Sequence, residues 1–180
     1  MPSEPIEHTI LTIALIGMLA ITLGACQWYG TVYLNESVSE GLTVIAEEIK
    51  NVIVDSTASI AQRTGNITLT RSLNLPERIH ESLYVVRIAY DEKEESCVIL
   101  ASDAINSYVK SSVKLPTIIH SLDDPRISEE VNQTAITLLS EIGVNPIESY
   151  KSSFKGQVLW LVKISINNEE WILCGFGEKS

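Results

Sequence analysis

The stretch ILTIALIGMLAITLGAC, residues 10–26, carries no charged side chain, and the interpretation of the whole sequence depends on it. It belongs to a longer run, Thr9 to Leu34, that contains no Asp, Glu, Lys, Arg or His. A helix needs about 20 apolar residues to cross a hydrocarbon core of about 30 Å. Aromatic residues, which favour the membrane interface, gather at the downstream end as Trp28, Tyr29 and Tyr33. The run therefore predicts a single membrane-spanning helix with lipid as its partner.

Two other interpretations of the apolar run are open at this point. A cleaved secretory signal normally begins with basic residues, but residues 1–8, MPSEPIEH, contain two glutamates and neither Lys nor Arg. The segment Leu23-Gly24-Ala25-Cys26 resembles a bacterial lipobox, in which Cys26 would accept a lipid. A flexible tether usually follows a lipoprotein cysteine, whereas a helical pattern continues here. Both alternatives are therefore weaker than the membrane helix.

Beyond the aromatic residues, apolar side chains recur at intervals of four and three residues, which places them along one side of a helix. The pattern ends near Gly65, and one long helix over roughly residues 5–64 is expected. Ala20 and Gly24 form a small-xxx-small pair that permits close approach of another helix. The expected stripe consists of Val38, Leu42, Ile45, Ile49 and Val52, with Ile60 further on.

The segment SEPIEHTILTIALIGMLAITLG, followed by an amphipathic helix, resembles the N-terminal stem of archaeal type IV pilin-like proteins, which include the archaellins. The stretch LNLPERIHESLYVVRI resembles the start of their head domains. The resemblance implies a helical stem that packs against sister subunits and a β-rich head outside the cell. It also implies that a glutamate near the start of the stem pairs with a neighbouring subunit, and Glu4 and Glu7 are the candidates. Residues 1–8 contain no basic leader of the kind that pilin precursors carry.

After Gly65 the hydrophobic period changes from helical to alternating, which is typical of strands. Strands are expected at 67–73, 83–90, 97–102, 107–116, 158–166 and 171–177. The segments on either side of 91–95, and those on either side of 167–170, should form antiparallel hairpins. A helix is expected over 127–142, with Ser128 as its cap and Gly143 as its stop, although a strand is the alternative there. The predicted class is α+β, with a helical stem (1–64) and a β-rich head (65–180).

Signals for catalysis are weak in this sequence. His8, His80 and His120 are far apart and fit no metal-ligand spacing, so surface or loop positions are expected for them. Asp123-Asp124 is a pair that suits a cation, but a solvated loop is the better interpretation. We find no glycine-rich phosphate loop, nucleophile elbow or Cys-x-x-Cys motif. The sequence accordingly predicts no enzyme, no cofactor and no metal site.

Two kinds of covalent modification are candidates if the head lies outside the cell. Cys97 and Cys174 fall in expected strands and would close a long loop as a disulfide, or would remain buried thiols. Acceptor patterns for N-glycosylation begin at Asn35, Asn66 and Asn132.

The formal net charge of −10, with Lys and Arg scattered along the chain, argues against nucleic acid as a partner. The predicted function is structural: a pilin-like subunit of a cell-surface filament, inserted once in the membrane with its head extracytoplasmic. The alternative is an anchored binding or sensing domain that does not polymerise. A membrane-tethered hydrolase is a third candidate, for which no pair of nucleophile and base is evident.

Overall fold

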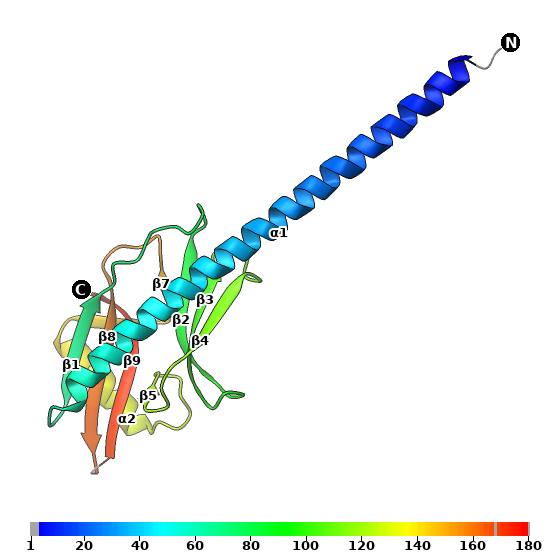
Figure 1. Ribbon diagram of the computed structural model, residues 1–180. Helices are drawn as coiled ribbons and strands as arrows, with labels where there is room; N and C mark the ends of the chain where they lie inside the picture. The colour runs from blue at the N-terminus through cyan, green and yellow to red at the C-terminus, as the bar shows by residue number, and fades with distance from the viewer. Residues whose placement is uncertain (1–3, 168, 180) are drawn as a thin grey trace. The chain divides into compact units, whose positions relative to one another are not determined.

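The computed structural model describes residues 4–167 and 169–179 (Figure 1), although side chains are described only from residue 8 onward. The chain divides into two compact units, residues 1–37 and 38–180. Helix α1 (Glu4–Ala61) contributes to both units. A long apolar N-terminal helix followed by a β-rich domain agrees with the predicted α+β class. The boundary between the units follows Ser37, and the second half of α1 belongs to the core of the head.

The head part of α1 packs its apolar stripe into the main hydrophobic core. Val38, Leu42, Ile45 and Ile49 are almost completely buried there, as the spacing predicts. Val52 is only partly buried, and Ile53 takes the next core position instead. A helix turns by 3.6 residues while the predicted stripe advances by 3.5, so the buried face drifts by one residue over these turns.

The first sheet has the strand order β1-β8-β9-β5, and β6 also pairs with β9. Strand β8 lies between β1 and β9 in antiparallel register, and β5 runs parallel to β9. The hairpin of β8 and β9 was expected from the sequence, whereas β5 and β6 were not. The strands are β1 (Ile67–Ser72), β5 (Ile119–His120), β6 (Val144–Ile147), β8 (Gln157–Ile166) and β9 (Glu169–Lys179).

Strand β8 is covered on both faces. Leu159 and Leu161 belong to the core that α1 covers. Trp160 and Val162 belong to a second core that lies under the helix α2. Because successive side chains point to opposite faces, a nearly continuous apolar run is what a strand between two helical layers requires.

The second sheet has the order β4-β3-β2-β7 and is antiparallel throughout. The expected hairpin around residues 91–95 is present, with Asp91 opposite Ser96. Inward-facing side chains of β2 and β3 join the core that α1 and the first sheet form. The strands are β2 (Tyr84–Asp91), β3 (Ser96–Asp103), β4 (Lys110–Lys114) and β7 (Tyr150–Lys151).

Helix α2 (Glu129–Glu141) confirms the helix expected over 127–142 and excludes the strand alternative. Its cap is Ser128, whose hydroxyl accepts a hydrogen bond from the Val131 N–H at 3.4 Å. Val131, Ala135 and Leu139 form the buried face. Ile142 follows the last helical residue and is exposed.

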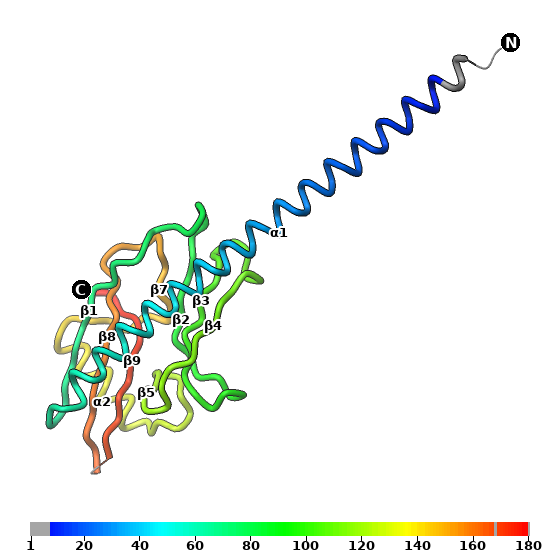
Figure 2. Tube along the Cα trace, viewed as in Figure 1, coloured from blue at the N-terminus to red at the C-terminus, as the bar shows by residue number. Residues whose placement is uncertain are grey.

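A buried lysine closes the C-terminal end of α1, which has no basic residue in its own last turn. Lys163 faces the same side of β8 as Leu159 and Leu161, and its side chain is 1% exposed. Its ammonium donates to the carbonyl of Ala61 at 3.1 Å and to that of Arg63 at 2.8 Å. A cation at this position satisfies terminal carbonyls and complements the helix dipole. From there the chain passes through a short loop into β1 (Figure 2).

Candidate functional site

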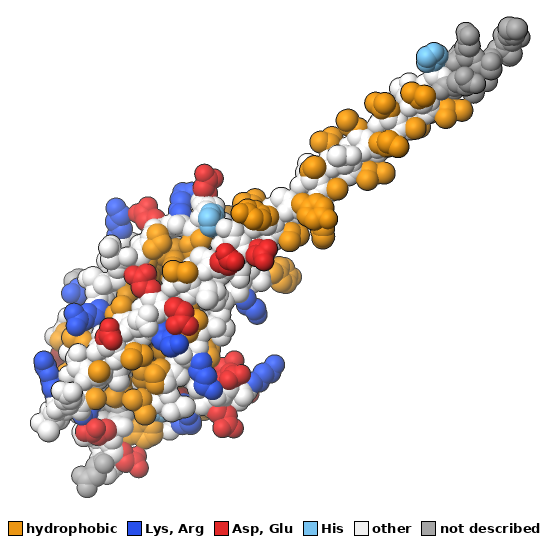
Figure 3. Space-filling view, in the orientation of Figure 1, with side chains coloured by type: hydrophobic (Ala, Val, Ile, Leu, Met, Phe, Trp, Pro, Cys, Tyr) orange, Lys and Arg blue, Asp and Glu red, His pale blue; other side chains and the backbone are white. Residues whose placement is uncertain are grey.

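The apolar segment of α1 exposes its side chains all round. The large hydrophobic residues between Ile10 and Leu34 are between 44% and 75% exposed. Figure 3 shows hydrophobic side chains along the visible side of this segment. It is long and apolar enough to cross a membrane, and none of its most apolar window is buried. A segment of this kind is not explained as the core helix of a soluble unit, because such a helix is mostly covered by other parts of its own chain.

The expected assembly residues fall into two groups. Ala20 and Gly24 lie in the exposed apolar segment, and a Cβ added at Gly24 would meet no atom within 4 Å. This surface is open to another helix. The stripe from Val38 onward is buried inside the head and is therefore not an intermolecular surface of this fold. The side chains of Glu4 and Glu7 lie outside the described residues.

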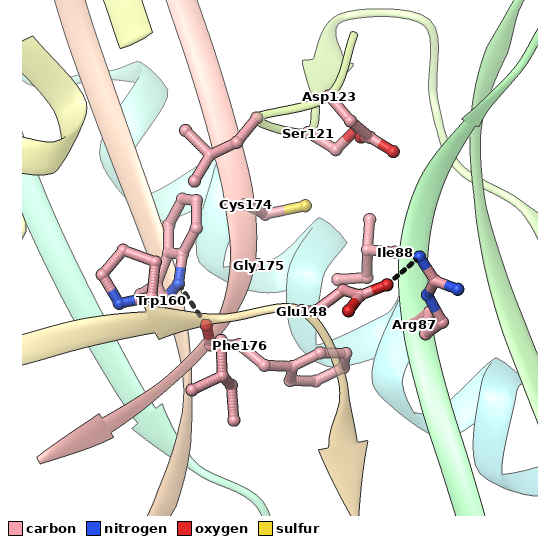
Figure 4. A pocket seen from close by; sticks show the side chains of 12 residues that line it. Arg87, Ile88, Ser121, Asp123, Glu148, Trp160, Cys174, Gly175 and Phe176 are labelled. Atoms are coloured by element: carbon pink, nitrogen blue, oxygen red, sulfur yellow. Dashed lines mark hydrogen bonds and ion pairs between the residues drawn. The ribbon is translucent and has the colours of Figure 1, made fainter. Parts of the chain in front are cut away.

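A cavity of about 440 Å³ opens between the two sheets of the head (Figure 4). Arg87 and Ile88 of β2 form one wall, and Cys174 to Phe176 of β9 form another. An ion pair between Arg87 and Glu148 lies at the edge of the cavity, with both side chains half-exposed or more. The lining combines apolar side chains with a few charged and polar ones, which is the usual composition of small-molecule sites. Sequence patterns gave no signal for this cavity, because the residues come from strands and loops far apart in the chain.

The wall of the cavity at β9 depends on a close approach between Gly175 and Trp160. A Cβ added at Gly175 would lie 2.4 Å from the Trp160 ring, so only glycine fits against the indole. The Trp160 Nε1–H donates to the carbonyl of Phe176 at 2.8 Å, which satisfies the one polar atom of the buried ring. These contacts fix the ring beside the cavity (Figure 4).

A buried polar cluster lies beyond Ser121, on the loop that follows β5. Asp124 is 2% exposed, which corrects the expectation of a solvated loop at this residue, whereas its neighbour Asp123 is exposed as expected. Arg126 donates to both carboxylate oxygens of Asp124, at 2.9 Å from Nε and 2.6 Å from a terminal nitrogen. His120 Nδ1 lies 2.8 Å from the same carboxylate. This histidine lies in β5 with its side chain 12% exposed, rather than in the surface or loop position that was expected. Burial opposes ionisation, but the hydrogen bonds from Arg126 and His120 outweigh it and hold the pKa of Asp124 well below its usual range.

The arrangement of this cluster is that of a structural ion network. The Ser121 hydroxyl binds Asp123 and the Cys97 thiol, which lies 3.3 Å away. Burial raises the pKa of Cys97, which keeps the thiol protonated and poorly nucleophilic. The Ser121 hydroxyl donates to the Asp123 carboxylate, and the Cys97 thiol lies 3.8 Å from the Asp124 carboxylate, which Arg126 and His120 also contact. Among the described residues, no group of three His, Cys, Asp or Glu side chains is placed to hold a metal ion.

The candidates for covalent modification differ in accessibility. Cys97 and Cys174 are buried free thiols in the same core cluster, whereas Cys26 is exposed in the apolar segment. Asn66 is exposed, and its side-chain oxygen accepts a hydrogen bond from the Ser165 N–H at 3.0 Å.

The other two candidate asparagines for glycosylation are half-buried. Asn35 lies within α1. Asn132 lies in α2, where its amide nitrogen donates to the Leu122 carbonyl at 3.2 Å. A glycan attaches through this nitrogen, so the fold disfavours Asn132, and Asn66 is the exposed one of the three candidates.

No family model, curated protein or solved structure matches this chain. Its class therefore rests on the fold and on the exposed apolar segment alone.

Proposed function

We propose that this protein is a membrane-anchored structural subunit that assembles through the N-terminal segment of α1, in the manner of archaeal type IV pilin-like proteins. The observation that carries the proposal is the uncharged run from Thr9 to Leu34, whose side chains are exposed and find no cover among the residues that the structure describes. Burying apolar area contributes roughly 25 cal/mol per Å². Side chains of this kind are stable only against lipid tails or other apolar helices.

Helix-to-helix assembly is supported by the small residues on one side of the segment. Ala20 and Gly24 are four residues apart and therefore lie on the same helix face. Small residues let two backbones approach closely, which favours packing between helices in a lipid environment. Through packing of this kind, the stem would join subunits to one another as well as anchor them in the membrane.

An extracytoplasmic head is part of this proposal. The exposed position of Asn66 within an N-glycosylation pattern supports it, as does the resemblance of the stem to pilin-like proteins. Trp28, Tyr29 and Tyr33 would mark the membrane interface nearer to the head.

A second candidate function is an anchored binding domain, and the cavity between the sheets favours it. Its volume of about 440 Å³ falls within the range of small-molecule sites. On this alternative the apolar segment serves only as an anchor and the head acts as a monomer.

Self-association in a bilayer distinguishes the two candidates. The full chain, with Cys26→Ala and a fluorophore on an Ile118→Cys variant, is reconstituted in phosphatidylcholine vesicles at falling protein-to-lipid ratios. Energy transfer between copies that persists on dilution supports assembly, and filaments seen by electron microscopy would extend it. Transfer that falls to the level of random encounters at every ratio would leave the monomeric binding domain.

A pair of leucine substitutions tests which face carries the assembly. Gly24→Leu places a large side chain on the small-residue face, and we expect it to weaken energy transfer. Thr22→Leu is the matched control, because a residue two positions away points about 200° round the helix. Equal loss in both variants, or in neither, would contradict packing through Ala20 and Gly24.

A further inference from the structure

The most exposed large apolar side chains among the described residues lie on one turn of the head. Ile105 is 88% exposed and Tyr108 is 93% exposed, and both lie between β3 and β4. Single exposed apolar residues are common on protein surfaces. Two such residues within four positions, each more exposed than any large hydrophobic residue of the apolar segment, indicate a contact surface.

The turn that carries these side chains is held in place by its own hydrogen bonds. Asp103 is buried, and one of its carboxylate oxygens accepts from the N–H groups of Ile105 and Asn106, both at 2.7 Å. The Val109 N–H donates to the Asn106 carbonyl at 2.9 Å. The two exposed side chains therefore project from a turn that hydrogen bonds hold in one conformation, and Val109 packs in the core.

This turn lies at the end of the head unit where the chain enters it. Ser111, just after the turn, lies 2.9 Å from the Thr43 hydroxyl of α1. The Ala104 N–H donates to the carbonyl of Leu83 at 2.8 Å, which joins the turn to the loop before β2. Figure 1 shows both loops beside the first turns of α1 that belong to the head.

The covalent chain brings this end of the head close to any bilayer that takes up the apolar segment. Leu34 is the last residue of the uncharged run, and Val38 is the first residue of the head unit. Four residues span at most about 14 Å even when fully extended. This limit holds for every orientation of the two units, because it depends only on chain length.

We propose that the β3–β4 turn is a second membrane contact, in which Ile105 and Tyr108 enter the headgroup region of the lipid bilayer. The inference rests on the proposed function, because it requires the apolar segment to lie in a membrane. Tyrosine has an apolar ring with a polar tip, which suits this region. Charges of both signs lie in the chain beside the turn and in the loop that Ala104 joins to it, namely Lys110, Arg78, Glu77 and Glu81. The contact is therefore expected to depend on apolar insertion rather than on anionic lipid.

Spin labels on introduced cysteines measure this contact in the full chain. The background carries Cys26→Ala, and the two remaining cysteines are buried. Labels are placed singly at Ile105→Cys, at Ile118→Cys and at Ile21→Cys, in phosphatidylcholine vesicles. Ile118 is a matched control, because it is also exposed and lies near the opposite end of β3, where Leu115 donates to the Cys97 carbonyl. Oxygen, which concentrates in lipid, and a water-soluble nickel complex serve as relaxation agents.

We expect the label at 105 to lose accessibility to nickel and gain accessibility to oxygen relative to the label at 118. Equal accessibilities at 105 and 118, with the label at 21 in lipid, would overturn the turn contact and leave the anchor intact. A label at 105 shielded from both agents would indicate a protein neighbour and would also overturn it. A label at 21 that is open to nickel would overturn the anchor and the turn contact together.

Discussion

Replacing Lys163 by methionine removes the cation that closes the C-terminal end of α1 while keeping a side chain of similar length. The ammonium donates to two carbonyls, those of Ala61 and Arg63, and pairs with Glu170 at 2.8 Å. In Lys163→Met both carbonyls lose their charged donor. We expect the last turn of α1 to loosen and the head to lose stability.

The size of the loss follows from these contacts. A hydrogen bond to a charged group contributes about 1.5–3 kcal/mol, so the two carbonyl bonds together account for about 3 kcal/mol at the lower limit. The pair with Glu170 adds less than about 1 kcal/mol, because the glutamate is 58% exposed. The methionine variant does not have to bury a charge, and the desolvation cost that it avoids offsets about 1–2 kcal/mol of this loss. A net loss of about 2 kcal/mol is expected, or a fall of about 5–8 °C in the melting temperature of the head.

Urea unfolding in detergent, followed by the fluorescence of Trp160 and Trp171, measures this loss. Glu170→Gln isolates the ion pair and should cost less than about 1 kcal/mol. Lys155→Met is the matched control at an exposed lysine and should be neutral. Amide exchange at residues 58–61 should quicken in Lys163→Met alone. A change below about 0.5 kcal/mol, with unaltered exchange at the helix end, would refute the proposed role of the lysine.

Three further outcomes follow from the head. Asp124→Asn should cost about 2–4 kcal/mol at pH 7. The pKa of Asp124 is lower in the folded state than in the unfolded state, so its contribution to the free energy of unfolding is present above the unfolded-state pKa near 4 and is lost at lower pH. The denaturation curves of the variant and the wild type should therefore converge on acidification, and a difference in stability that stays constant with pH would contradict this. Burial raises the pKa of both Cys97 and Cys174, so mass spectrometry should find iodoacetamide on them only after denaturation, and rapid labelling of the native protein would count against the buried positions. Gly175→Ala should cost about 1–3 kcal/mol in thermal unfolding, because its methyl group would overlap an indole ring; a neutral result would show that the ring moves aside.

Local sequence patterns were sufficient for the elements whose signals are periodic or capped. The stripe from Val38 to Ile49, the helix that Ser128 caps and the two expected hairpins are all present. Each depends on residues close together in the chain. The two-residue strand β5 is too short to give a period. The buried face of α1 moved to Ile53 because helix and sheet geometry, rather than an ideal repeat, decides which side chain meets the core.

The cavity and the polar cluster could not be predicted from local sequence patterns, because their residues are distant in the chain and come together only in the folded structure. Asp124 looks like a loop residue in sequence, and only the fold places it under Arg126 and His120. Lys163 was part of an expected strand, but its role depends on the end of α1, about 100 positions earlier in the chain. The exposed turn at Ile105 and Tyr108 likewise looks like the end of one strand and the start of the next.

The contribution of α1 to the core of the head determines where a protease can cut the head away from the apolar segment as an intact domain. Leu42, Ile45 and Ile49 are core residues, and Lys163 secures the end of the same helix. A cut before Val38 leaves every one of these contacts with the released fragment. A cut after Ala61 removes one wall of the core and exposes the sheet faces beneath it, so shedding at that point destroys the domain that it frees.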